Sequence, residues 1–362
     1  MTFDNMTFEG IFNSEVFKGY LEENLPQYEE GLAFAQLFPV MPIDGLEFSY
    51  IKGANGAIEL ASPSAYDAEP ITQHRKGFDA MKGELPLFRK KMDLSEKEKS
   101  LLKLYIQANK NEAVVRLISQ IFNDQATLVQ GSLMTQEFLR ARALMDGKIN
   151  IESKGGAVSF DYKVPATHKF TLSGAGKKWS DPEAKILDDI IKWCDTVETD
   201  TGFRPAVMVL NRTTFQYLKN NKQIKGAAFP MGAINVPINT FGMADSTVIE
   251  AIKNATGLTD IVVYNRKVQL DGKLLDLVED NKVAIVPAGA LGETMIGTSP
   301  AEINMEDANK SGANISILSN GLAVNTYTNF KAPYTSGTEI EWVGLPSFPA
   351  AGQVVLATVD GE

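Results

Sequence analysis

The chain has 362 residues, of which 44% are hydrophobic and 22% are charged, a composition typical of globular proteins that excludes a disordered or fibrous chain. Its formal net charge of −10 predicts a surface that repels phosphate, which argues against tight binding of nucleic acid. The single cysteine excludes an internal disulfide, and no apolar run is long enough to span a membrane. Because one hydrophobic core stops growing at roughly 250 to 300 residues, we expect two lobes or more.

The first 45 residues are expected to form an arm. Two helical stretches are predicted at 14–24 and 28–37, and Pro26 separates them because proline disrupts a helix interior. The acidic character of residues 1–10 is unlike that of a signal peptide, so we expect a protein that is made and kept in a reducing cytoplasm.

The next segment is interpreted as an extended ribbon. Between Leu46 and Leu60, apolar residues fall on alternate positions around Gly53 and Gly56, which predicts a hairpin. The stretch that follows is interrupted by proline and glycine and is too weakly apolar to close a core. A two-stranded ribbon is marginal alone in water, so we expect residues 46–90 to lie on another subunit.

A long helix is predicted for residues 95–146. Ser95 and Glu98 form a capping-box pattern at its start, and Gly147 offers a C-cap after its end. The apolar residues in between keep mostly helical spacing. A hairpin that turns at Gly155 is expected to follow.

A second lobe is expected to begin at Ser180, where an N-cap residue, an early proline and a glutamate predict the start of a helix that ends near Gly202. Strands and helices then alternate as far as residue 300, which indicates a mixed α+β lobe. The expected strands span 206–210, 261–264 and 283–286 with a hairpin at Asp271-Gly272, and the expected helices span 213–220 and 246–255.

Two features of the C-terminal half stand out. Residues 226–242 interleave glycine and proline with large apolar side chains, so this loop is either folded over its own lobe or placed against a partner. The chain then ends in short predicted strands, which we expect to return to the long helix. They span 322–330, 339–343 and 354–359.

The sequence offers no constellation of residues typical of an enzyme. His74 and His168 lie far apart in loops, and we interpret both as solvated. Cys194 falls on the apolar face of its predicted helix and is interpreted as a core residue. Residues 174–178 lack the spacing of a phosphate-binding loop, and the adjacent acids at 188–189 point in different directions on a helix. We therefore expect no catalytic residue, no cofactor and no metal.

Short motifs along most of the chain resemble those of the phage major capsid protein E family. The motifs are Leu37-Phe38-Pro39, residues 48–53, 63–70, 84–86, 140–145, 147–149, 161–162, 179–182, 289–294 and 297–298. The resemblance implies an α+β, HK97-like phage capsid fold. In that fold we expect an N-terminal arm at 1–45, an extended β-hairpin loop at 46–90, a peripheral domain at 91–180 with its spine helix at 95–146, an axial domain at 181–310, and C-terminal strands at 311–362 that return to the peripheral domain.

The same resemblance implies a structural role rather than catalysis. The chain would be the major capsid protein of a tailed double-stranded DNA bacteriophage, assembling in the host cytoplasm into hexamers and pentamers of an icosahedral head. It would enclose the packaged DNA without sequence-specific binding and without contact with a membrane. The implied partners are a separate scaffolding protein and a portal protein, with a decoration protein as an optional addition. We expect no covalent crosslink between subunits.

Residues expected to take part in assembly lie in the two extended segments. They are Tyr50, Lys52, Tyr66 and Arg75 in the extended loop, and Phe229, Met231, Ile234 and Phe241 in the loop that would face the capsomer axis. Two alternatives remain open. An HK97-like cellular nanocompartment shell protein would be encoded beside a cargo enzyme, and a soluble α/β enzyme would need a small-molecule ligand and a small oligomer.

Overall fold

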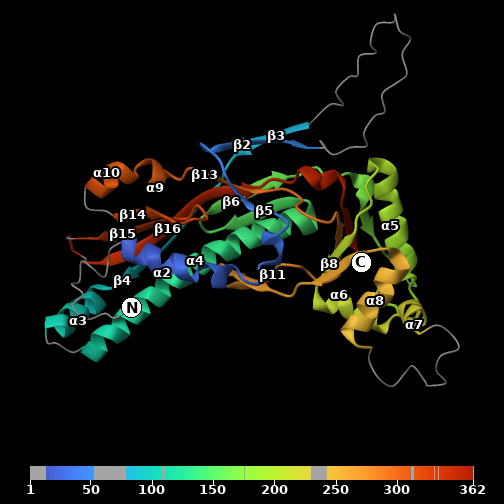
Figure 1. Cartoon of the computed structure of the whole chain (residues 1–362), viewed down its shortest axis with the longest axis horizontal. Helices are drawn as coiled ribbons and strands as arrows, with labels where there is room; N and C mark the ends of the chain where they lie inside the picture. The colour runs from blue at the N-terminus through green and yellow to red at the C-terminus, as the bar shows by residue number, and fades with distance from the viewer. Residues whose placement is uncertain are drawn as a thin grey trace, which may run out of the picture.

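The computed structural model describes residues 14–52, 79–107, 111–174, 176–229, 243–310, 314–329, 331–332 and 334–361. Its backbone forms two lobes that lie side by side (Figure 1). In the larger lobe, here called the peripheral lobe, helix α4 (Asn111–Asp146) crosses a sheet and contacts strands β4 (Leu87–Leu94) and β16 (Ser336–Pro346). The smaller lobe, here called the axial lobe, lies beyond the C-terminal end of α4 and carries helix α5 (Ile186–Thr201).

The peripheral sheet is built around β16, whose 11 residues are almost all buried. Strand β4 pairs with one edge of β16 and strand β15 with the other, both antiparallel. Trp342 of β16 stacks on Phe88 of β4 with ring centroids 4.5 Å apart, which adds to the stabilisation of this strand pair. The remaining strands are β1 (Val40–Pro42), β13 (Thr294–Gly297), β14 (Asn314–Ile317) and β15 (Ala323–Thr328), in the order β1-β13-β16-β15-β14.

The axial lobe has its own sheet and its own apolar core. The core is centred on Trp179, Trp193 and Cys194, and the two indole rings stack at 5.6 Å. The strand order is β7 (Lys169–Thr171), β17 (Val355–Thr358), β12 (Lys282–Val286), β8 (Val207–Leu210) and β9 (Asp260–Val263). The helices after α5 are α6 (Arg212–Asn220), α7 (Lys222–Ala228) and α8 (Asp245–Thr256).

The remaining elements are two-stranded ribbons, helices and short turns. Three two-stranded ribbons are formed by β2 (Glu47–Lys52) with β3 (Asp79–Glu84), β5 (Lys148–Ser153) with β6 (Gly156–Asp161), and β10 (Lys267–Leu270) with β11 (Lys273–Asp276). The other helices and turns are α2 (Ser14–Glu29), η1 (Ala33–Ala35), α3 (Glu96–Gln107), η2 (Ala166–His168), α9 (Pro300–Ile303), α10 (Met305–Lys310) and η3 (Pro349–Gly352).

Several local predictions are confirmed. The Ser95 backbone N–H donates to a carboxylate oxygen of Glu98 (2.9 Å), so the capping box forms and α3 begins directly after it. Gly147 follows α4 with a φ of +65°, and Asp271 and Gly272 both have positive φ in the turn between β10 and β11. The single predicted spine helix is described as two helices, α3 and α4, and residues 108–110 lie outside the described part of the chain.

Two predictions about helix ends are wrong. Helix α2 continues through Pro26 to Glu29, because its residues Leu21 and Leu25 are buried, and the arm then has only a short 3-10 turn where a second helix was expected. Helix α5 begins at Ile186 rather than near Ser180. The side chain of Asp181 accepts a hydrogen bond from the Glu183 backbone N–H (2.9 Å), which closes a separate turn before the helix.

Three long-range expectations also need correction. Strand β2 pairs with residues 79–84, whereas the sequence placed the returning strand near Leu60. Strand β17 pairs with β12 in the axial sheet and does not return to α4 as β16 does. His168 is 1% exposed, not solvated, because η2 packs against α5 and brings the ring Nε2 to 3.1 Å from a carboxylate oxygen of Asp200.

Candidate assembly surface

The ribbon of β2 and β3 lies along the margin of the molecule (Figure 1). Aromatic packing anchors it to the body of the peripheral lobe. Phe48 and Tyr50 of β2 and Met81 of β3 are all buried, although a two-stranded ribbon by itself has no interior. Their burial comes from the body of the peripheral lobe, since β2 contacts η3 and Phe48 meets Phe160 of β6 edge to face at 5.2 Å. The base of the ribbon is therefore part of the core of its own subunit.

A glycine makes this anchoring possible. Gly83 lies directly opposite Phe48 in the antiparallel register. A Cβ atom at this position would come within 2.8 Å of the Phe48 ring, so a larger residue would displace it. From Phe48 a series of edge-to-face contacts runs inward through Phe160 and Tyr162 to Phe348, at 4.9 and 5.8 Å for the last two pairs. Position 83 thus controls how the ribbon is seated.

The predicted assembly residues of the extended loop occupy different places. Tyr50 is buried beneath the ribbon, and burial raises the pKa of its hydroxyl well above the ordinary value. Lys52 ends β2, where its backbone pairs with Asp79. Tyr66 and Arg75 lie outside the described residues. Of this group, Tyr50 therefore supports the seat of the ribbon from within its own subunit.

The predicted residues of the apolar loop are mostly not described. Phe229 directly follows α7 and packs, partly buried, against the axial core. Met231, Ile234 and Phe241 lie outside the described residues. Phe229 and Tyr50 belong to the cores of different lobes, so the structure does not bring these two predicted residues together.

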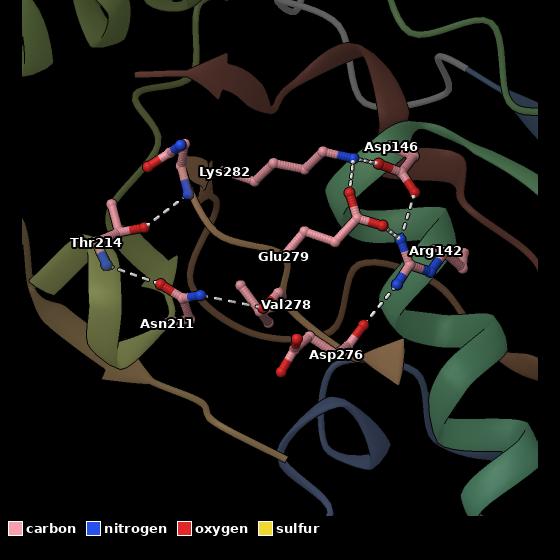
Figure 2. A network of polar contacts seen from close by, with 9 residues as sticks. Arg142, Asp146, Asn211, Thr214, Asp276, Val278, Glu279 and Lys282 are labelled. Carbon is pink, nitrogen blue, oxygen red and sulfur yellow. Dashed lines mark hydrogen bonds and ion pairs between the residues drawn. The ribbon is translucent and has the colours of Figure 1, made fainter. Parts of the chain in front are cut away.

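A polar network fixes the axial lobe to the end of the spine helix (Figure 2). The Arg142 guanidinium bonds to the carboxylates of Asp146 and Glu279 and donates to the carbonyl oxygen of Asp276 at 2.6 Å. Lys282 contacts the same two carboxylates, with its Nζ 2.6 Å from Glu279. Burial opposes the charged form of Glu279, but Lys282 and Arg142 outweigh it and hold its pKa below 4.5.

The network extends into the axial lobe through neutral groups (Figure 2). The Asn211 side chain donates to the carbonyl oxygen of Val278 (3.3 Å) and accepts from the Thr214 backbone N–H (2.8 Å), which also caps α6. The Thr214 hydroxyl accepts from the backbone N–H of Asn281 (3.1 Å). The segment between β11 and β12 is therefore bonded to α4 on one side and to α6 on the other, so it joins the two lobes at this point.

A second, more deeply buried network connects the arm to both lobes. Glu137 of α4 is 0% exposed and accepts from the Phe34 backbone N–H (2.9 Å) and the Tyr264 hydroxyl (3.0 Å). Arg140, one turn further along, contacts Glu137 at 3.4 Å and donates to the Thr294 hydroxyl at 2.8 Å. Burial raises the pKa of Glu137 more than these partners lower it. One carboxylate thus links the arm, the spine helix and the axial lobe.

A groove on the peripheral lobe offers a concave surface of mixed character. It has a volume of about 630 Å3 and lies among α4, β4 and the hairpins β5–β6 and β10–β11. Phe88, Phe138 and Trp342 give it apolar walls, and Lys90 and Lys267 add positive charge. Large apolar side chains are also exposed elsewhere in the described parts of the chain, among them Leu46 (40%) and Leu87 (41%) beside the ribbon. An apolar groove with a polar rim is typical of contact surfaces, whereas singly exposed apolar residues are common on any protein.

The predicted core position of Cys194 is confirmed. Cys194 is fully buried as predicted, and burial raises the pKa of its thiol to about 11, which makes it a poor nucleophile. None of the helices in the described parts combines the length and apolarity needed to cross a bilayer.

Sequence reasoning missed the residues that seat the ribbon and join the lobes. The pairing of Phe48 with Gly83 follows from the register of β2 and β3, and this register cannot be predicted from the sequence. Arg140 and Arg142 occur in one of the motifs that carried the family resemblance, and their alternation within an apolar helix is a signal of buried ion pairs. Glu279, an acidic partner of Arg142, is distant in sequence and carries no such signal.

Comparison with known proteins agrees with this geometry. A family model described as phage major capsid protein E matches residues 27–320. The fold is similar to that of a phage-related protein from Bordetella bronchiseptica RB50, with a TM-score of 0.53 and 14% identity over 94% of this chain and 96% of that chain. It is also similar to a proposed prophage capsid protein of Escherichia coli CFT073, with a TM-score of 0.60 and 15% identity over 96% and 99% of the two chains. No curated protein matches the sequence.

Proposed function

This chain belongs to the phage major capsid protein E family, and on that premise we propose that its β2–β3 ribbon, together with residues 53–78 between the two strands, is the element through which subunits join into hexamers and pentamers of an icosahedral head. As a phage capsid protein it is a structural component of the virion. The predicted α+β, HK97-like fold is confirmed by the mixed helix and sheet architecture and by its likeness to the prophage capsid protein.

The seating of the ribbon carries the proposal. Burial of Phe48, Tyr50 and Met81 fixes the direction in which β2 and β3 leave the body, while residues 53–78 between them make up a segment long enough to reach beyond it. A ribbon held rigidly at its base loses less conformational entropy when its far part binds a neighbour. The aromatic seat therefore favours assembly without itself being part of the subunit interface.

The interlobe network supports the same function. Hexamers and pentamers require one chain to fit two different curvatures, so the angle between lobes must be well defined in each. The contacts of Arg142 and Lys282 with Asp146 and Glu279 join α4 to the axial lobe by charged groups. The Lys282–Glu279 pair is the more exposed part of the network, and pairs near the surface exchange partners at low cost. We infer that small changes of lobe angle occur at this network.

The test is an assembly experiment with a variant that keeps both strands of the ribbon. Residues 54–77 are replaced by a short glycine-rich turn, and the variant and the wild type are compared by sedimentation and negative-stain microscopy, alone and with the neighbouring phage genes. We expect closed particles from the wild type and folded monomers or small oligomers from the variant. Closed particles from both would refute the role of the ribbon, and substrate turnover by an unassembled wild type would favour an enzyme.

We propose the remaining partners and properties on the basis of the family. A separate scaffolding protein would guide assembly in the host cytoplasm, a portal protein would occupy one vertex, and a decoration protein would be an optional addition. The net charge of −10 suits a wall that encloses double-stranded DNA without gripping it. Catalysis is not proposed, since the buried thiol of Cys194 lacks nucleophilic character.

A further inference from the structure

A small oxygen-lined pocket lies where helix α3, helix α4 and strands β4 and β16 meet. Its volume is about 80 Å3, room for roughly two or three water-sized groups. Carboxylates reach it from three elements, namely Asp93 of β4, Glu98 of α3 and Asp124 of α4. Two of these are already engaged, because Asp93 bonds to the Tyr327 hydroxyl and Lys91, and Glu98 caps α3 through Ser95.

The third carboxylate lacks such compensation. Among the residues that the structure describes, none forms a hydrogen bond or ion pair with Asp124, and its pKa is raised by burial and by the nearby negative charge of Glu98. Lys99 follows Glu98 in α3, but its ammonium donates to the carbonyl oxygen of Thr335 at 3.2 Å. Two like charges therefore face one another across the pocket without a cation between them.

A buried amide supplies an independent observation. Gln125 is 2% exposed and lines the same pocket. Its Nε2 donates to the Thr338 hydroxyl at 2.6 Å, whereas its Oε1 has no partner among the described residues. A buried carbonyl oxygen without a donor is destabilising, because it has lost its hydrogen bonds to water. The pocket thus combines an unpaired neutral oxygen with one uncompensated carboxylate, Asp124, which faces the negative charge of Glu98.

We propose that this pocket binds a hard divalent cation, with calcium as the best fit, between Asp124, Glu98 and the Oε1 of Gln125. Among the described residues no group of three histidine, cysteine or carboxylate side chains is arranged to hold a metal by itself. The ion is therefore held by two carboxylates, one amide oxygen and waters. Calcium accepts six to eight oxygens in flexible geometry, whereas magnesium requires a near-ideal octahedron.

Binding at this place would couple elements that otherwise repel one another. The cation neutralises Asp124 and Glu98 and satisfies Gln125, so it ties α3 to α4 beside the edge of the peripheral sheet. The affinity is that of a weak, partly solvated site, with a dissociation constant on the order of 0.1 to 1 mM. The peripheral lobe would then gain stability from the divalent ions of the surrounding medium.

The experiment uses the purified full-length chain, stripped with a chelator and titrated with calcium chloride. The melting temperature should rise by about 2 to 4 °C at 10 mM calcium. Sodium chloride at equal ionic strength should give a smaller rise. Terbium is a direct probe, because Tyr327 bonds to Asp93 beside the pocket and can sensitise its luminescence. Calcium should displace the terbium.

Two variants and a control make the outcome decisive. Asp124→Asn should raise the melting temperature of the stripped protein and weaken calcium and terbium binding at least about tenfold. Gln125→Glu should be less stable than the wild type without calcium and should recover that stability when calcium is added. Glu152→Gln, an exposed position on β5, is the control and should behave as the wild type. Absence of displaceable terbium, or equal binding by Asp124→Asn, overturns the proposal. A Gln125→Glu variant that calcium does not rescue also overturns it, by indicating that the amide is reversed and donates to the carboxylates.

Discussion

Truncation of Phe48 tests how the ribbon is held. Phe48 is only 3% exposed, and its ring lies 5.2 Å from that of Phe160. Phe48→Ala removes this ring. Such truncations cost about 3 to 5 kcal/mol, and we expect the lower end because the seat lies at the margin of the lobe. If the free energy of detaching the ribbon from the body falls by about 3 kcal/mol, the population of the detached form rises roughly a hundredfold.

Hydrogen exchange measures that population directly. Peptides that cover residues 47–52 and 79–84 should exchange about a hundredfold faster in Phe48→Ala, whereas peptides from β12, in the axial sheet, should keep their protection. Leu46→Ala is the matched control, since Leu46 is 40% exposed beside the same ribbon and its truncation should change exchange little. Exchange of the ribbon at the wild-type rate in Phe48→Ala would refute the reasoning, because another contact would then hold it.

Three further predictions concern the lobes. Gly147→Ala should lower the free energy of unfolding by about 2 kcal/mol or more in a urea titration, because Gly147 has a φ of +65° and a Cβ there would meet Val164 at 2.7 Å. Glu279→Gln should remove part of the acid sensitivity of the fold. The pKa of Glu279 is held below 4.5, so its stabilisation is present above that pH and lost as the pH falls through the lowered value; after screening it amounts to about 0.5 to 1 kcal/mol, seen by comparing urea titrations at pH 7 and pH 3.5. Cys194, whose thiol pKa is raised to about 11, should react with a thiol reagent at pH 8 in the unfolded chain and not in the native one.

Each of these has a contrary result that would count against it. Gly155→Ala is the control for Gly147, since a Cβ there meets nothing closer than 3.8 Å, and equal losses in both would point to a general effect of removing glycine. An unchanged pH profile in Glu279→Gln would mean that Arg142 and Lys282 are satisfied without that carboxylate. Native labelling of Cys194 would mean that the axial core opens readily.

The sequence predicted features that depend on a few neighbouring residues. The capping box at Ser95 and Glu98, the left-handed glycine at Gly147 and the tight turn at Asp271 were all predicted and confirmed, because each is settled within a single turn of backbone. Strands β8, β9 and β12 and helices α6 and α8 were placed within a few residues for the same reason. Where a local signal was contradicted, as at Pro26, burial of a leucine face outweighed the cost of proline within the helix.

The tertiary structure decided which strands pair and which distant side chains come into contact. Nothing in the segment after Leu46 indicates that its partner strand is 79–84, and nothing near residue 355 indicates that β17 completes the axial sheet. The seat of Phe48 and the bonds of Arg142 to Glu279 likewise join residues far apart in the chain. Local signals need only the conformational preferences of adjacent residues, whereas these pairings follow from the total apolar surface and charge that the whole chain can bury or pair at once.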